Sequence, residues 1–181
     1  MSGRAASNRS HSVVLPPPDG AEIKTNNGTD FFSDASEFLK RLQAGNFLEH
    51  ATVYGHSYGI LKSELLAKLR EGKDVLLNVD VQGAATIRER AEDEPELKKA
   101  LVTVFLTPPS VEILEARLKK RDQDSPPVIA KRLAVAKQEV AQWKNFDYLL
   151  LSTTKPEDLR RMMEIVEAEK MRVARSHAPE F

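Results

Sequence analysis

The chain has 181 residues and a mass of 20.3 kDa, which is the size of one domain rather than of several independent ones. Its 27 Lys and Arg residues balance 27 Asp and Glu residues, so no net positive field favours nonspecific binding to nucleic acid or to a membrane surface. It contains no Cys and no apolar run long enough to cross a bilayer, which excludes disulfides, a thiol nucleophile and a membrane-spanning helix. We therefore expect a cytoplasmic protein with neither nucleic-acid nor membrane partners.

Residues 1–29 are expected to form an irregular N-terminal arm. They contain Ser, Asn and Gly and the run Pro16-Pro17-Pro18, and their apolar content is almost confined to Val13-Val14-Leu15. That apolar stretch is too short for the core of a signal peptide. The folded domain is expected over 30–181.

Local sequence signals predict the first elements of this domain. Ser and Asp caps with an acid in the first turn start a helix near 33–37, and Gly45 closes it. Aromatic and β-branched residues predict a strand over 47–54 that ends at Gly55. Apolar spacing then predicts a helix over 60–69, stopped by Gly72.

Three continuously apolar runs predict strands that are buried on both faces of a parallel sheet. They are 75–80, which is apolar until its polar end, and 101–106 and 148–151, each of which leads into a turn and a helix start. This alternation of strands and helices is typical of an α/β fold. A helix before the last strand carries an apolar stripe, and we expect Trp143 at its end to be packed.

Polar residues at the end of the first buried strand are candidates for ligand contacts. Asn78 and Asp80 lie two residues apart at the polar end of the strand 75–80, and ligands bind at the carboxyl ends of strands in open α/β sheets. Asp80 could hold a metal-bound water or a substrate amine. It could equally be a cap for the Gln82-Gly83 turn.

Arginines on the predicted helices are candidates for phosphate contacts. Arg117 and Arg121 lie four residues apart on one helix face, and Arg132 follows beyond a break at 123–127. Guanidinium groups over a phosphate neutralise its charge, as phosphoryl transfer requires. A solvated charged helix face is the simpler alternative.

A polar corner surrounds the strand predicted at 47–54. Glu49 and Tyr58, with Gly55 and Gly59, could read a base or phosphate edge, or they could be surface groups of a β-turn. His50 and His56 lack the spacing of a metal site. We predict no protein-bound metal.

Known catalytic motifs give a mostly negative result. No GxxxxGK[ST] phosphate loop occurs in the sequence, because Gly72-Lys73 is followed by Asp74 and preceded by Ala67 at the first glycine position. GxSxG and HExxH motifs are absent as well.

The order and spacing of several segments nevertheless resemble the guanylate kinase family from about Asn27 to Arg172. They are Asn46-Phe47-Leu48-Glu49, Gly55-His56-Ser57-Tyr58-Gly59, Asn78-Val79-Asp80-Val81-Gln82-Gly83, Thr107-Pro108-Pro109-Ser110, Arg117-Leu118-Lys119-Lys120-Arg121, Lys131-Arg132-Leu133 and Phe146-Asp147-Tyr148. The resemblance implies a P-loop NTPase-like, three-layer α/β fold with a parallel sheet. It also implies a small NMP-binding subdomain at about 30–60 and a helical lid at about 120–135.

Site roles follow from the same resemblance. The family transfers the γ-phosphate of ATP to GMP with Mg²⁺. Glu49, Tyr58, Gly59, Asn78 and Asp80 would contact GMP, with Asp80 also near the metal-bound phosphates. Arg121 and Arg132 would stabilise the charge that is transferred.

The sequence departs from the family at the phosphate side. Leu15-Pro16-Pro17-Pro18-Asp19-Gly20 stands where the family has arginines for the GMP phosphate, and the first strand with its phosphate loop is not recognisable. We therefore expect little or no kinase activity from this chain alone. We also expect a gap in the sheet, whose exposed edge could pair with a protein partner or a second copy. A non-catalytic binding module for GMP or a protein is the alternative function.

Overall fold

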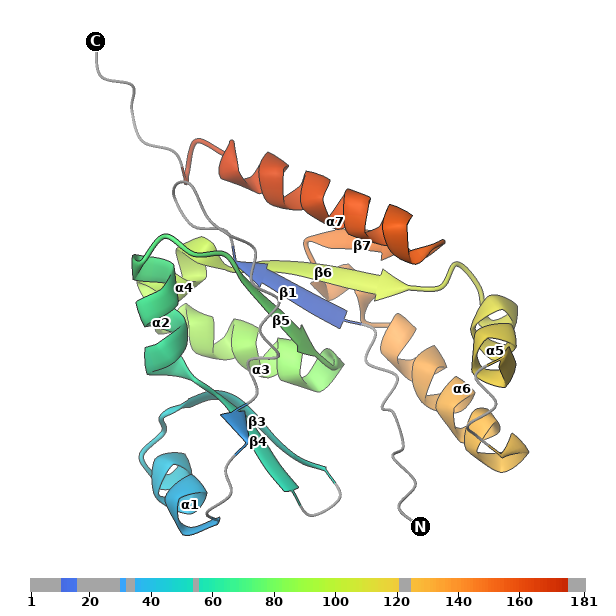
Figure 1. Ribbon diagram of the computed structural model, residues 1–181, viewed down its shortest axis with the longest axis horizontal. Helices are drawn as coiled ribbons and strands as arrows, with labels where there is room; N and C mark the ends of the chain where they lie inside the picture. Colours follow the sequence, from blue (N-terminus) through green and yellow to red (C-terminus); the bar gives the residue numbers. More distant parts are fainter. Residues whose placement is uncertain (1–10, 16–29, 32–34, 54–55, 121–124, 176–181) are drawn as a thin grey trace.

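The computed structural model describes residues 11–15, 30–31, 35–53, 56–120 and 125–175 (Figure 1). At its centre is a four-stranded sheet in the order β5-β1-β6-β7. Its strands are β1 (His11–Leu15), β5 (Val75–Val79), β6 (Val102–Thr107) and β7 (Tyr148–Leu151). The three strands predicted from apolar runs are therefore confirmed, but the prediction that each is buried on both faces is wrong for β7, where Leu149 and Leu151 are 45% and 42% exposed at the edge of the sheet.

Strand β1 differs from the expectation for residues 1–29. It lies between β5 and β6 and pairs antiparallel with both, whereas β6 and β7 are parallel. The prediction of an irregular arm is thus wrong for His11–Leu15, and the gap expected in the sheet is filled. The apolar residues of this segment form a strand because the neighbouring strands offer backbone partners on both sides, a non-local effect that composition does not reveal.

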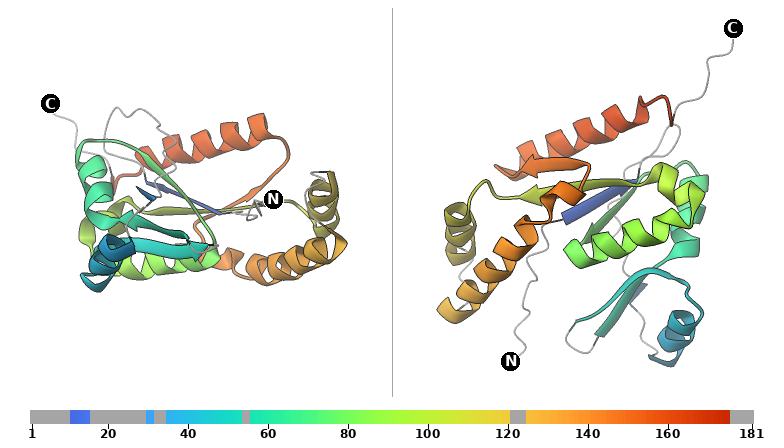
Figure 2. Two further views of the ribbon diagram at one scale, coloured as in Figure 1. Left: turned by 60° about the horizontal axis from the view of Figure 1, so that its bottom comes forward. Right: turned by 180° about the vertical axis from the view of Figure 1, so that it is seen from behind.

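Helices cover both faces of this sheet (Figure 2). α7 (Lys155–Lys170) packs on one face, where Val104, Leu150 and Val166 form a buried cluster. α3 (Val81–Glu92) lies on the other face, and Ala84 and Ile87 at 0% exposure join a larger cluster there. The sheet and its two helical layers give the three-layer arrangement that the sequence predicts.

A smaller sheet and two helices lie beside α3 (Figure 1). The sheet has the order β2-β4-β3, with β2 (Asp30–Phe31), β3 (Phe47–Val53) and β4 (His56–Leu61). α1 (Ala35–Gln43) and α2 (Lys62–Arg70) flank it. The sequence reading missed β4, because that strand depends on pairing with β3 and carries a glycine at position 59.

The remaining helices connect the strands of the central sheet. They are α4 (Pro95–Ala100), α5 (Val111–Lys120), α6 (Pro126–Val140) and the short helix η1 (Trp143–Asn145). α5 and α6 pack together through Leu114, Leu118 and Ile129. Trp143 is 41% exposed, so the prediction that it is packed is wrong: α6 ends before it. Among the described residues, no helix combines the length and the apolar character that crossing a membrane requires.

Candidate functional site

The carboxyl ends of the parallel strands carry polar residues that cap the helices that follow. The Asp80 carboxylate accepts a hydrogen bond from the Gly83 amide at 2.8 Å and so caps α3. Ser110 Oγ accepts from the Ile113 amide at 3.3 Å in the first turn of α5, and Thr154 Oγ1 accepts from the Glu157 amide at 3.4 Å at the start of α7. This edge, where open α/β sheets bind ligands, therefore has three helix starts directed at it.

Glu49 lies against the start of α3. A Cβ atom placed on Gly83 would stand 3.2 Å from Glu49 Oε1 and 3.3 Å from Glu49 Cγ, so the carboxylate is in close contact with the first turn of the helix. The Arg90 guanidinium, near the other end of α3, donates a hydrogen bond to the Phe47 carbonyl. β3 and α3 are thus joined at two places, and they bring Glu49 and Asp80 to the same corner. We call Glu49, Asp80 and Gly83 the α3 corner.

The β3–β4 hairpin is itself tightly packed. Gly59 faces the ring of Phe47, where an added Cβ would come within 2.5 Å of Cδ1 and Cε1, so no side chain fits at this position. Phe47 also packs against Phe38 of α1, with ring centroids 4.8 Å apart. The backbone of Tyr58 pairs with Phe31 and Ala51, but its side chain lies outside the described part of the structure.

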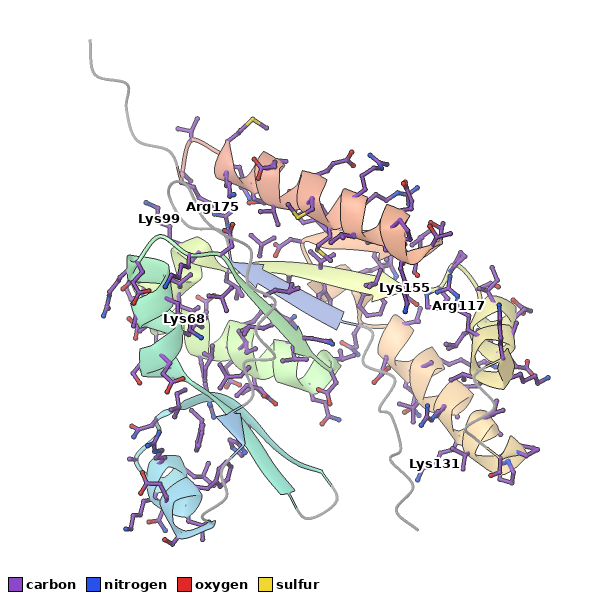
Figure 3. All side chains as sticks on the ribbon, viewed as in Figure 1. Lys68, Lys99, Arg117, Lys131, Lys155 and Arg175 are labelled. Carbon is purple, nitrogen blue, oxygen red and sulfur yellow. The ribbon has the colours of Figure 1, made fainter. Side chains whose placement is uncertain are left out.

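Arg117 connects α5 to the turn between β7 and α7 (Figure 3). It donates hydrogen bonds to Ser152 Oγ at 2.8 Å and to the carbonyls of Ser152 at 3.0 Å and Thr153 at 2.9 Å. The carboxylate of Asp158 accepts from Ser152 Oγ at 2.6 Å and from the Thr153 amide at 2.8 Å. This guanidinium is therefore engaged in holding the turn, which neither the phosphate interpretation nor the solvated-face interpretation anticipated.

A second carboxylate approaches Asp80 from α6. Burial raises the pKa of the Glu139 carboxyl, and the negative charge of Asp80 raises it further. The carboxyl end of α6 thus faces the start of α3, as the ribbon also shows (Figure 1). The sequence reading missed Glu139, although its position seven residues after Arg132 puts both on one helix face.

The structure also places two of the other predicted site residues. Asn78 is exposed on β5 and shares the sheet face of Leu76, which packs toward α7, whereas Val79 packs toward α3. Arg132 is half-buried on α6 and Arg121 lies outside the described residues. The structure therefore unites Glu49 with Asp80 and leaves Asn78 on the opposite face of the sheet.

The described residues also bear on metal binding. They contain no cluster of three or more His, Asp or Glu side chains that could hold an ion. Mg²⁺ commonly binds through one or two carboxylates together with substrate phosphates, so Asp80 fits as a single protein contact to an ion that arrives with a nucleotide.

Comparison with known proteins identifies the family. A protein-family model described as guanylate kinase matches residues 19–169. The chain belongs to the guanylate kinase family. Guanylate kinases from Coxiella burnetii and Idiomarina loihiensis are 40% and 42% identical to it over 141 and 142 residues, each alignment covering 78% of this chain. The chain spans just under two thirds of these relatives, 65% and 64% of their lengths.

A solved structure supports the same assignment for the fold. The crystal structure of guanylate kinase from Anaplasma phagocytophilum matches with a TM-score of 0.61 and 28% identity, covering 92% of this chain and 77% of that chain. The P-loop NTPase-like α/β class predicted from the sequence is thereby confirmed. In this guanylate kinase family member, the α3 corner is built from two of the segments that carry the sequence resemblance.

Proposed function

We propose that this chain binds GMP at the α3 corner and belongs functionally to the phosphorylation of GMP to GDP by Mg²⁺·ATP. The observation that carries the proposal is the contact of Glu49 with the first turn of α3. A carboxylate there can accept hydrogen bonds from N–H donors of a guanine edge. Asp80, which follows β5 and caps α3, adds a second acceptor to this corner.

The other predicted site residues divide between this proposal and the fold. Tyr58 would donate a hydrogen bond to the GMP phosphate, and Gly59 would keep the β3–β4 hairpin tightly packed. Asn78 lies on the other face of the sheet and has no GMP contact in this proposal. Arg121 and Arg132 neutralise charge on the phosphoryl group in transfer, because this reaction depends on positioning and electrostatic stabilisation. Asp80 is the protein group that would hold a water of a Mg²⁺ ion arriving with ATP, and that ion would supply neutralisation of phosphate charge. The subdomain at about 30–60 would supply Tyr58 and Gly59, and the lid at about 120–135 would supply Arg121 and Arg132.

We further propose that phosphoryl transfer by this chain alone is weak. The sequence has no GxxxxGK[ST] loop, and the strand between β5 and β6 runs antiparallel to both. A phosphate loop follows the carboxyl end of a strand and leads into a helix, so a reversed strand directs its carboxyl end to the opposite edge of the sheet. This observation favours a second function, a GMP-binding or partner-binding module without efficient catalysis.

Nucleotide binding and turnover test the proposal together. GMP is expected to raise the melting temperature of the purified chain, since a ligand that binds only the folded state stabilises it. The shift is expected to vanish in Glu49→Ala and to persist in Glu89→Ala, a matched change of an exposed carboxylate on α3. A GMP effect that is equal in both variants would contradict the proposal. Formation of GDP with Mg²⁺·ATP, measured on the same samples, separates the kinase from the binding module.

A further inference from the structure

A β-bulge directs consecutive residues of β3 toward α3. The register of β3 and β4 shifts between Phe47 and Glu49, so that Phe47 pairs with Leu61 and Glu49 with Ile60. An extra residue in one strand bends it and redirects its side chains. Leu48, the residue at the bulge, is 0% exposed in the core cluster that includes Ala84 and Ile87 of α3.

Hydrogen bonds and core packing hold the first turn of α3 in place next to Glu49. Asp80 Oδ1 accepts from the Gly83 amide at 2.8 Å, and the Asp80 carbonyl accepts from the Ala84 amide at 2.9 Å. Ala84 is 0% exposed, so the helix is packed on its core side immediately after Gly83. A Cβ atom on Gly83 would also meet Val79 Cβ at 3.1 Å.

Gly83 therefore lies between two fixed elements. Its missing side chain leaves the space in which the Glu49 carboxylate stands, since an added Cβ would be 3.2 Å from Oε1. The separations from Val79 Cβ and from Glu49 Oε1 are both tighter than ordinary van der Waals contact. Val79 is buried in the core cluster, whereas the Glu49 carboxylate lies at the end of rotatable bonds, so we expect the carboxylate to give way first. A methyl group at position 83 would displace Glu49 by a few tenths of an ångström away from the helix start.

We propose that Gly83 is a positioning residue for base recognition: its lack of a side chain sets the place of the Glu49 carboxylate and thereby the discrimination of guanine from bases without its amino group. The inference rests on the proposed GMP binding. Guanine presents a ring N–H and an exocyclic amino group side by side. To accept a hydrogen bond from each of them, the two carboxylate oxygens of Glu49 must stand at fixed positions. IMP, the same nucleotide without the exocyclic amino group, offers one donor fewer.

Calorimetric titration of the full chain with GMP and with IMP tests this role. Gly83→Ala is expected to weaken GMP binding about tenfold, the loss of one charge-assisted hydrogen bond, and to change IMP binding much less. The ratio of GMP affinity to IMP affinity in Gly83→Ala is therefore expected to fall toward the ratio measured for Glu49→Ala. Gln82→Ala is the matched control, because Gln82 is exposed in the same helical turn, and it is expected to keep the wild-type ratio.

A double-mutant cycle distinguishes displacement of Glu49 from a general effect on folding. In the Glu49→Ala background, Gly83→Ala is expected to change GMP affinity less than about twofold, because the displaced group is gone. An equal loss in both backgrounds, or an unchanged GMP-to-IMP ratio in Gly83→Ala, would overturn the inference.

Two further outcomes are covered by a second variant, Glu49→Asp, and by the wild type. Should Gly83→Ala fail to fold, Glu49→Asp moves the carboxylate from its place with Gly83 intact, and an unchanged ratio there also overturns the inference. Absence of GMP binding in the wild type is a different result, which contradicts the proposed function itself.

Discussion

The α3 corner and the turn after β7 lie at the two ends of the sheet edge that is formed by the carboxyl ends of the parallel strands. The charged groups at these two ends have different contacts. At the α3 corner the core packing of Leu48 and the bare backbone of Gly83 place the Glu49 carboxylate beside the start of α3. At the β7 turn the Arg117 guanidinium is engaged by Ser152 and Thr153. The contrast shows that a charged residue in a family motif can serve the fold, as Arg117 does, whereas Glu49 is the residue that we propose for ligand recognition.

Of the three changes considered, truncation of Leu48 is expected to lower the free energy of unfolding most. Leu48→Ala removes a fully buried side chain between β3 and α3, and we expect the free energy of unfolding to fall by about 3 kcal/mol. Urea denaturation measures it. Leu39→Ala on α1 is the control, because Leu39 is 54% exposed and a change within about 0.5 kcal/mol is expected. A loss for Leu48→Ala no larger than for the control would mean that the α3 corner is not fixed by this packing.

Removal of Arg117 is expected to lower the stability of the fold without changing GMP affinity. Arg117→Ala leaves two carbonyls and the Ser152 hydroxyl without their donor, and we expect a loss of about 2 kcal/mol in unfolding free energy. GMP affinity is expected to stay within about twofold of wild type, since the α3 corner is built from other elements. Lys119→Ala, which breaks only the exposed pair with Glu115, should be nearly neutral. A large loss of GMP affinity in Arg117→Ala would show that the two ends are not separate.

Neutralising Glu139 is expected to have the smallest effect. Burial and Asp80 raise the pKa of the Glu139 carboxyl in the folded chain, so its ionised form opposes folding. Glu139→Gln should therefore raise the melting temperature at pH 7 by roughly 1–3 °C. The gain should shrink as the pH falls through the folded and then the unfolded pKa of Glu139, because wild-type Glu139 is then protonated in both states. A gain that stays constant from pH 4 to pH 7 would contradict this electrostatic origin.

The sequence predicted the parts of the fold that local patterns determine. The apolar runs of β5, β6 and β7 and the acidic first turn of α1 were sufficient for correct elements, whereas the predicted cap at Ser33 and Asp34 lies outside the described residues. β1 and β4 were missed because both depend on pairing with strands distant in the chain or across a turn. Glu49 and Asp80 were recognised from family segments, but their contact through Gly83 requires the bulge at Leu48, which no sequence period reveals.

We propose that this chain recognises guanine but transfers phosphoryl groups only weakly. Calorimetric titration of the purified chain with GMP, in the absence and then in the presence of Mg²⁺·ATP, tests both halves in one measurement. We predict a saturable heat of GMP binding in both titrations and no sustained heat of reaction when Mg²⁺·ATP is present. Absence of GMP binding, or continuous heat from turnover with Mg²⁺·ATP, would contradict the account.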